Sequence, residues 1–372
     1  MTVGIKPDVA FAAQTVHRRW MSEEYERGLV SVIIPTYNRA HLVTKAMDSV
    51  WQQTYRPIEL IVVDDGSTDN SQEVVEQWGN AHADDAHFKL RYFRQENRGA
   101  SAARNFGLIE SRGESIQFLD SDDLLGQMKI AAQVDYLRHE MRFDAVYGRW
   151  RSFIELSHGG FAVSLPSRQY NGDTLLTSWI EGRFIGSHAI LWRRKTAVEL
   201  GPWDEKAFCN NDGEYAYRFM ISGRIFGWSP NGWAYNRRGG DDHLGAVVSR
   251  RSAEALFRIA ERLVAELTAR NMLNLQLRKS IARHYFRIAR AAVGVHSEIA
   301  FECFMRIKRL GTAHPAQVMM YASGTRGAML ITKALMSVLR SWRKRRGMKP
   351  IEGKGRVGSL DELIRLDTVS SR

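Results

Sequence analysis

The chain has 372 residues and a formal net charge of +12, and its 44% hydrophobic and 25% charged content is ordinary for a globular protein. Two cysteines, Cys209 and Cys303, are too few for a disulfide framework, which favours a reducing, cytoplasmic location. No stretch reaches the roughly 18 apolar residues that a membrane span requires, and we expect no signal peptide. The positive charge does not by itself distinguish a nucleic acid, an anionic lipid or an anionic substrate as partner.

Short apolar runs alternate with segments of helical spacing in the first third of the chain. The apolar runs cover residues 30–34, 58–63, 90–93 and 115–119. Helical segments cover residues 40–53, a stretch around 74–75, and 99–110. This alternation predicts a largely parallel sheet with crossover helices, in which ligands bind beyond the carboxyl ends of the strands.

The pattern is more mixed after residue 140 and becomes helical from Ser252. We expect strands at 145–150, 188–192 and 225–228, and a last helix at about 328–344. The predicted organisation is a lead-in at 1–28, a main domain at 29–250, a helical region at 251–346 and a loose tail at 347–372.

Polar clusters follow three of the predicted strands. After the first, Pro35-Thr36-Tyr37-Asn38 offers an aromatic face for a nucleobase, although a turn with Asn38 as helix N-cap is also consistent. After the second, Asp64 and Asp65 offer acceptors for base or ribose donors, and the same residues suit a turn.

The fourth strand ends in Asp120-Ser121-Asp122-Asp123. Carboxylate oxygens suit Mg²⁺ or Mn²⁺, and carboxylates crowded at a strand end favour a cation that offsets their repulsion. Asn97-Arg98-Gly99 and Arg104, before and within the third helix, are consistent with a diphosphate site or with a solvated loop.

The order of these clusters resembles the inverting family 2 glycosyltransferases of the GT-A fold, from about Val30 to Leu125. Two strings carry the resemblance: VSVIIPTYNRAHLVTKAMDSVWQQTYRPIELIVVDDGSTDNS and ENRGASAARNFGLIESRGESIQFLDSDDLL. It implies an α/β protein with a mostly parallel, Rossmann-like sheet flanked by helices, here with a helical C-terminal appendage.

The resemblance also implies roles for single residues. Thr36, Tyr37 and Asp64 match positions that hold the nucleobase, usually uracil, while Asp120 lies near the ribose and Asp122 binds the metal. Arg98 and Arg104 match the stretch near the donor phosphates and sugar. The remaining residues expected at the donor site are Pro35, Asn38, Asp65, Asn97, Gly99 and Ser121.

The second half matches more loosely, through GPWDEKAFCNNDGEYAYRFMISG. Asp212 takes the place of the catalytic base and Arg218 that of a following arginine, whereas Asn211 stands where the family usually has Glu. Glu214 is the alternative base, and a plain helix N-terminal carboxylate is also consistent with Asp212. His243 matches a residue that can approach the metal, although a surface histidine fits its position equally well.

The function implied is a metal-dependent, inverting transfer from a nucleotide sugar, with UDP the expected nucleotide and Mn²⁺ or Mg²⁺ the cofactor. The acceptor is expected to be a glycan or a lipid-linked molecule of cell-surface polysaccharide synthesis. The Q-x-x-R-W signature of processive synthases is missing from the sequence, which favours a non-processive bacterial enzyme.

Two alternatives are a non-catalytic nucleotide-sugar-binding scaffold and a sugar nucleotidyltransferase, whose glycine-rich first loop is not found here. Nucleic acid is not expected as a partner, because no recognisable module accompanies the charge.

The predicted last helix is amphipathic and basic. It carries an apolar face that ends at Trp342 and is followed by a cationic end, Arg343 to Arg346. Such a helix is consistent with peripheral contact with an anionic membrane or with packing on the preceding helices.

Overall fold

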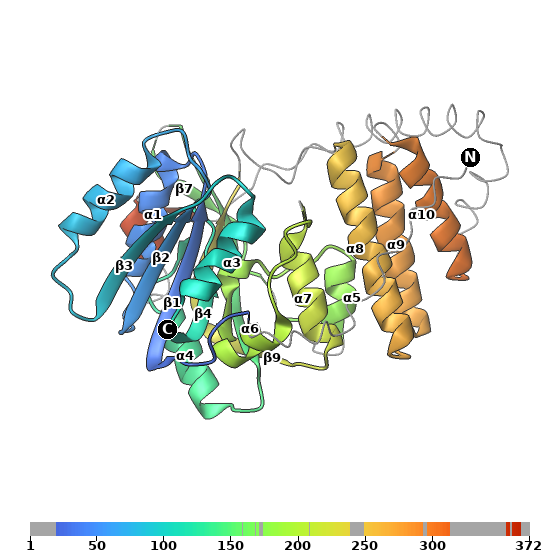
Figure 1. The fold of residues 1–372 in the computed structure, drawn as a ribbon, viewed down its shortest axis with the longest axis horizontal. Coiled ribbons are helices and arrows are strands. Elements are labelled where there is room, and N and C mark those ends of the chain that lie inside the picture. Colours follow the sequence, from blue (N-terminus) through green and yellow to red (C-terminus); the bar gives the residue numbers. More distant parts are fainter. Residues whose placement is uncertain are drawn as a thin grey trace.

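The computed structural model describes residues 20–157, 159–167, 169–170, 174–207, 209–238, 249–292, 296–312, 355–357 and 359–365. A sheet flanked by helices forms one end of the molecule, and three long helices form the other (Figure 1). The predicted helix at 328–344 and most of the 1–28 lead-in lie outside the described residues.

The strands of the sheet lie in the order β10-β7-β6-β8-β4-β1-β2-β3, and β9 pairs with both β5 and β6. Their bounds are β1 Glu26–Thr36, β2 Ile58–Asp64, β3 Phe88–Arg94, β4 Gly113–Phe118, β5 Leu124–Leu125, β6 Ala145–Glu155, β7 Phe161–Val163, β8 Ile190–Arg193, β9 Phe226–Arg237 and β10 Gly355–Val357. The helices are α1 Ala40–Trp51, α2 Ser71–Ala81, α3 Ala100–Glu110, α4 Lys129–His139, α5 Leu175–Ile180, α6 Arg194–Leu200, α7 Asn211–Ile221, α8 Arg250–Ala269, α9 Leu275–Ala292, α10 Ser297–Arg309 and α13 Leu360–Arg365.

The parallel half of the sheet confirms the alternation seen in the sequence. β4, β1, β2 and β3 run parallel, and the register sets Thr36 of β1 opposite Asp64 of β2. β2 is buried along its whole length, as an apolar strand covered on both faces should be. The polar clusters after these strands therefore lie at one edge of the sheet.

The other half of the sheet is largely antiparallel. β8 lies antiparallel to both β4 and β6, and β7 lies antiparallel to β6. The long strand β9 runs parallel to β6, and its last residues, Asn236 and Arg237, reach the loop that follows β4. Segments more than a hundred residues apart thus meet at the same edge.

Helix α3 packs directly against β1 at Gly107. A Cβ added at this glycine would lie 2.4 Å from Cγ2 of Ile33, so a larger side chain would force the helix off the strand. The close approach holds the second half of α3 against β1.

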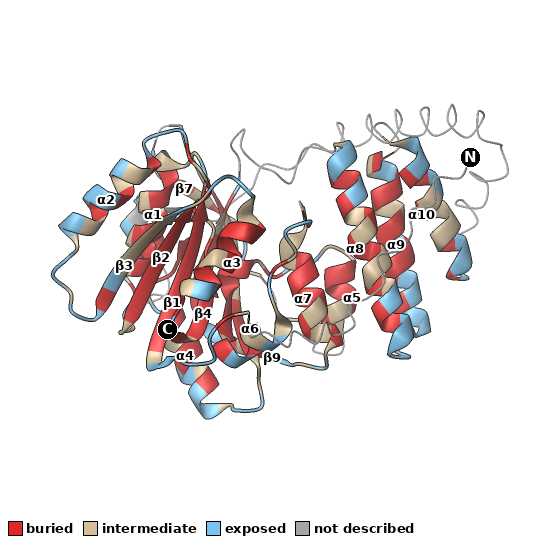
Figure 2. Ribbon diagram, in the orientation of Figure 1, coloured by how far each residue is buried: buried red, intermediate tan, exposed pale blue. Residues whose placement is uncertain are grey.

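Helices α8, α9 and α10 confirm the helical appendage. Their inward faces are buried, including Leu263 of α8, Tyr285 of α9 and Ile307 of α10, while their outward faces are exposed (Figure 2). These faces belong to the same hydrophobic cluster as the core of the sheet. The appendage therefore shares its core with the main domain.

Two short elements occur in the stretch that the sequence pattern led us to expect as a loose tail. β10 pairs antiparallel with β7, and Leu363 and Ile364 of α13 are buried. Each element is too short to produce a recognisable period in the sequence. Within the described residues no helix is long and apolar enough to cross a membrane.

Candidate active site

The residues after β1 and β2 form one side of the site. Thr36 is buried, whereas Tyr37 is 45% exposed and presents its ring at the sheet edge. Asn38 adopts a φ of 51°, and its side-chain oxygen accepts a hydrogen bond from the Thr68 backbone N–H at 2.7 Å. Asn38 is not the N-cap of α1, which is Arg39, and instead orders the loop after β2.

Asp64 and Asp65 are buried acceptors with different partners. Asp64 accepts hydrogen bonds from the Ser67 backbone N–H at 2.7 Å and from the Tyr92 hydroxyl at 2.8 Å. Burial, together with the Asp64 carboxylate, raises the pKa of Tyr92, so the phenol remains a donor. Asp65 accepts from the backbone N–H groups of Arg98 and Gly99, and so anchors the start of α3.

The two arginines of the predicted donor stretch lie in very different places. Arg98 is exposed and pairs with Glu205 at 2.7 Å, and the nearby Asn97 is also exposed. Arg104 is buried, with Nη2 2.6 Å from Asp120 and 3.8 Å from Asp212. Arg104 therefore joins the acidic loop to the predicted base.

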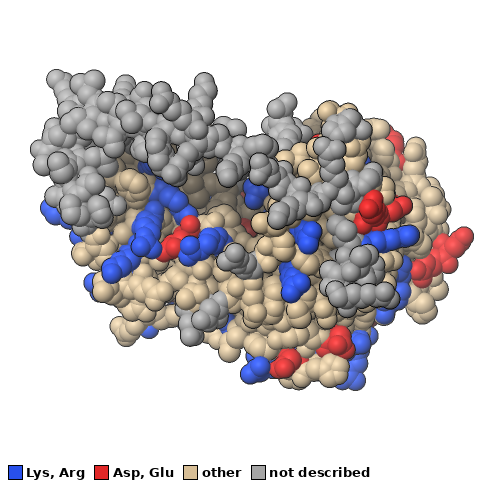
Figure 3. Space-filling model, turned by 180° about the vertical axis from the view of Figure 1, so that it is seen from behind, with Lys and Arg blue, Asp and Glu red and all other residues tan. Residues whose placement is uncertain are grey.

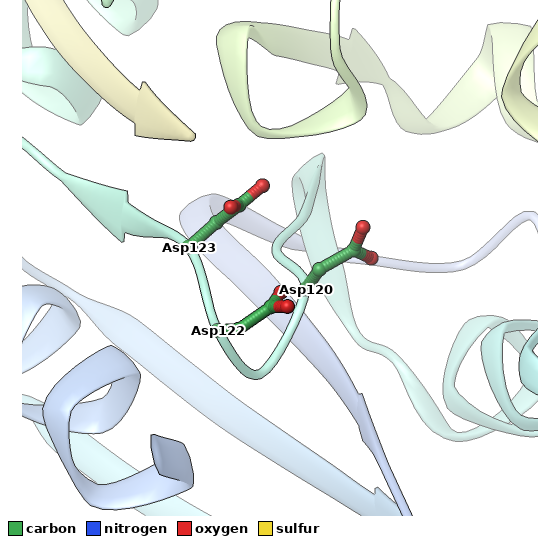
Figure 4. A group of neighbouring side chains, drawn as sticks. All are labelled: Asp120, Asp122 and Asp123. Carbon is green, nitrogen blue, oxygen red and sulfur yellow. The ribbon is translucent and has the colours of Figure 1, made fainter. Parts of the chain in front are cut away.

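The loop between β4 and β5 carries three carboxylates, Asp120, Asp122 and Asp123 (Figure 4). One oxygen from each lies within 4.8 Å of the others. The Arg39 guanidinium lies 3.0 Å from the Asp122 carboxylate. Ser121, between Asp120 and Asp122 in the chain, is buried. An all-oxygen group of this kind fits Mg²⁺ or Mn²⁺.

Asp123 differs from the other two carboxylates because protein donors saturate it. Its oxygens accept hydrogen bonds from the Asn236 amide at 3.1 Å and the Arg237 backbone N–H at 2.9 Å, and His188 Nδ1 lies 2.9 Å away. Asp123 thus ties β9 and the segment before β8 to the acidic loop. Asp120 and Asp122 remain better suited to a metal ion.

The acidic loop is electrostatically strained. Burial, together with the neighbouring Asp123 and Asp120, raises the pKa of Asp122 to about 6 against the opposing effect of Arg39. A divalent cation would relieve this repulsion by favouring the ionised carboxylate. The donor set and its electrostatics both fit a bound metal.

His188, just before β8, was not singled out from the sequence. Burial alone would lower its pKa, but the carboxylates of Asp123, Asp120 and Asp212 together outweigh burial and raise the pKa. Its Nε2 is buried with no hydrogen-bond partner among the described residues. A Cβ at Gly186 would lie 2.3 Å from the ring, so the glycine makes room for it. The one available signal was a histidine within an apolar run.

Asp212 lies in the first turn of α7, across Arg104 from the acidic loop. Its side chain is 32% exposed, and its Oδ1 is buried without a hydrogen bond from any described residue. Burial raises the pKa of Asp212, Arg104 opposes the rise, and Asp120 adds to it. A carboxylate with a raised pKa is a stronger base than an ordinary aspartate.

Glu214, the alternative base, is held in a different environment. It is 1% exposed and forms an ion pair with Arg218 at 2.9 Å. Arg218 also donates to the backbone carbonyls of Leu200 and Pro202. These contacts favour a structural role for Glu214. His243 lies outside the described residues.

Comparison with known proteins bears on the family to which the chain belongs. Residues 31–200 match the family model described as glycosyl transferase family 2. The glycosyltransferase GlyG of Streptococcus pneumoniae is 30% identical over 57% of this chain and 72% of its own length. An uncharacterized glycosyltransferase of Rickettsia typhi is 32% identical over 53% of this chain, and the match spans 60% of that relative.

A solved structure, S. aureus TarS residues 1–349, superposes with a TM-score of 0.50 and 16% identity, covering 80% of this chain and 92% of that one. The likeness concerns the fold alone. The sheet order, with an acidic loop after β4, defines a protein of the GT-A fold. The chain belongs to glycosyl transferase family 2.

Proposed function

We propose that this protein transfers a sugar from a nucleotide-sugar donor to an acceptor hydroxyl, with inversion and with a divalent metal. The observation that carries the proposal is the placement of Arg104 between Asp120 of the acidic loop and Asp212. One nitrogen of Arg104, Nη2, thus lies close to both the proposed metal-binding loop and the proposed general base, where donor diphosphate and acceptor would meet.

Asp120 and Asp122 would hold Mn²⁺ or Mg²⁺, which fit their oxygen ligands. When bound, the cation supplies Lewis-acid neutralisation of charge on the departing nucleoside diphosphate. His243 remains a candidate additional ligand. Arg39, which pairs with Asp122 at 3.0 Å, would place a cation beside the diphosphate.

Asp212 acts as the general base in this proposal. It takes the proton from the acceptor hydroxyl as the oxygen attacks the anomeric carbon from the side opposite the diphosphate, which inverts the configuration. Arg104 lies 3.8 Å from the buried Oδ1, and the side chain is 32% exposed, so the rest of the carboxylate is open to receive the proton. Glu214 is unsuited to this role because Arg218 holds it in a buried ion pair.

The nucleotide is proposed to be a uridine diphosphate, held between the Tyr37 ring and the ends of β1 and β2. Asn38, Asp64 and Asp65 order the surrounding loops through their hydrogen bonds. Thr36 has a buried hydroxyl with no hydrogen-bond partner among the described residues, which suits contact with a base. The acceptor is proposed to be a glycan or lipid-linked molecule in cell-surface polysaccharide synthesis.

Replacing Tyr37 by Ala is expected to weaken nucleotide binding by about 1 kcal/mol through loss of ring stacking. Isothermal titration of UDP, with Mn²⁺ present, measures the effect. Exposed Tyr25, at 51%, is the matched control, because Tyr25→Ala removes a ring before β1 begins. Equal affinity in wild type and Tyr37→Ala would contradict the nucleobase position.

We also propose a cytoplasmic enzyme that contacts the anionic inner face of the membrane through its C-terminal region. The support is the basic amphipathic pattern at 328–346, where each cation near such a surface contributes about 1 kcal/mol. The structure's free cysteines agree with a reducing compartment. On the face drawn in Figure 3, Lys and Arg side chains are spread over the described surface, including the end that holds the long helices.

In a flotation assay, the intact chain is expected to bind phosphatidylserine-containing vesicles, with binding that weakens as salt is raised. A truncation after Arg326 is expected to remain in the unbound fraction. Neutral phosphatidylcholine vesicles are the control. Equal binding by the truncated chain, or none by the intact one, would leave the 328–346 segment as a packing element.

A further inference from the structure

Residues 201–212, here called the base segment, connect α6 to the first turn of α7 and end at Asp212. On the sheet side, Asn105 of α3 accepts a hydrogen bond from the Trp203 backbone N–H at 2.7 Å and donates to the Trp203 carbonyl at 3.0 Å. The Trp203 ring lies flat on Tyr215, with centroids 4.3 Å apart, and the Arg104 guanidinium lies 4.7 Å from the Trp203 ring centroid. The segment therefore supports the arginine that contacts Asp212.

The opposite side of the base segment is held by α8, the first helix of the C-terminal appendage. Arg262 donates to Asp204 at 2.5 Å, directly beside Trp203. Arg258, one turn earlier on the same face of α8, donates to the Lys206 carbonyl. The Cys209 thiol lies 3.4 Å from the Ser252 carbonyl, which accepts its hydrogen bond.

Arg262 contacts residues both before and after Asp212 in the chain. Besides Asp204 it lies 3.9 Å from Glu214, which is buried in the same turn of α7 as Asp212. Asp204 is 14% exposed and Glu214 1%, so both ion pairs are shielded from solvent. Partly buried charge pairs fix geometry better than exposed ones, because screening and side-chain motion weaken them less.

We propose that Arg262 is a positioning residue for Asp212, so that the C-terminal appendage completes the acceptor side of the active site. The inference rests on the proposed function of Asp212. Arg262 acts through Asp204 and Trp203, which set the position of Arg104, and through Glu214, which sets the first turn of α7. It touches neither substrate.

The kinetic test replaces Arg262 by Gln. Loss of the ion pairs with Asp204 and Glu214 is expected to lower kcat by about tenfold to a hundredfold, since a displacement of about 1 Å at a reacting group lowers the rate by this factor. The KM for the donor and the affinity for UDP with Mn²⁺ are expected to stay at wild-type values. Arg270→Gln is the control, because Arg270 also lies at α8 and pairs with Glu266 at 3.2 Å, away from the base segment.

A second readout needs neither donor nor acceptor. The reaction rate of Cys209 with a thiol reagent reports how often the base segment separates from α8. Cys303, the other cysteine, is 0% exposed, so its reaction does not mask that of Cys209. Arg262→Gln is expected to raise the Cys209 rate by about tenfold, the effect of losing one charged hydrogen bond. Arg270→Gln is expected to leave it unchanged.

Arg262→Lys keeps the charge with fewer donors and is expected to give intermediate values in both readouts. It replaces Arg262→Gln if that variant does not fold. Combining Arg262→Gln with Asp204→Asn is expected to lower kcat little beyond the single change, because both remove one interaction. Wild-type kcat and Cys209 rate in folded Arg262 variants would overturn the inference.

The control variant Asp212→Asn separates this inference from the proposed function. If Asp212→Asn is inactive while the Arg262 variants are fully active, only the positioning role fails. If Asp212→Asn retains full activity, the assignment of the base fails. Loss of UDP affinity in Arg262→Gln that matches its loss of kcat would also overturn the positioning role, because it would show general disruption of the site.

Discussion

Replacing Asp212 by Asn is expected to lower kcat by roughly 10²–10⁴-fold, the usual contribution of a positioned general base. The amide has nearly the same shape, so Arg104 and the start of α7 should keep their places, but it accepts no proton. Affinity for UDP is expected to stay near the wild-type value, because Asp212 lies across Arg104 from the acidic loop. Steady-state kinetics together with UDP titration measure the two effects separately.

Glu214→Gln is the matched comparison for the base. Because Glu214 is held by Arg218 in a buried ion pair, its replacement is expected to lower the free energy of unfolding. Its kcat is expected to fall much less than that of Asp212→Asn. If Glu214→Gln folds normally but is inactive, and Asp212→Asn is active, the general base is Glu214 and not Asp212.

The pH dependence of kcat gives an independent check on Asp212. Burial raises its pKa above the ordinary aspartate value, and only the ionised form accepts a proton. With Mn²⁺ saturating, kcat is therefore expected to fall as the pH drops through this raised pKa, at a higher pH than an ordinary aspartate would give. The residual activity of Asp212→Asn is expected to lack this fall.

Removal of the divalent metal is expected to lower the transfer rate to about a thousandth of its original value or less. The reason is that the negative charge on the departing diphosphate would lose its main stabilisation. EDTA treatment followed by addition of Mn²⁺ or Mg²⁺ tests this directly. Asp122→Asn should give a comparable loss that added Mn²⁺ does not restore. Ser121→Ala, at the residue between Asp120 and Asp122, is the control for metal binding alone: whatever its effect on the donor, its activity is expected to respond to EDTA and Mn²⁺ as that of the wild type does. Full activity in EDTA would remove the metal role of Asp122.

The sheet edge could be predicted from the sequence because its signals are local. Apolar runs ending in Thr36, Asp64 and Asp120 indicate buried parallel strands, and parallel strands bring their ends to one edge. The register confirms this. The same local reasoning predicted the helical region that α8, α9 and α10 form, since helical period is visible within a single segment.

Contacts between distant segments could not be predicted in this way. Arg39 and Asp122 are 83 residues apart, and Asn236 and Asp123 are 113 apart, so no local pattern links them. The saturation of Asp123 by protein donors and the burial of His188 against it both depend on such contacts. The sequence left Asp212 and Glu214 as alternatives because they differ in surroundings, which only the fold supplies.

The central claim, transfer from a nucleotide sugar, is tested most directly by incubating the protein with UDP-, GDP- and dTDP-sugars and measuring released nucleotide. With Mn²⁺ present, we expect release from one class of donor, with UDP-sugars expected to be the active class. The release should fall to background in EDTA and by orders of magnitude in Asp212→Asn. A folded, Mn²⁺-loaded protein that neither binds nor cleaves any donor of the panel, or a release that persists undiminished in Asp212→Asn and in EDTA, would contradict the account.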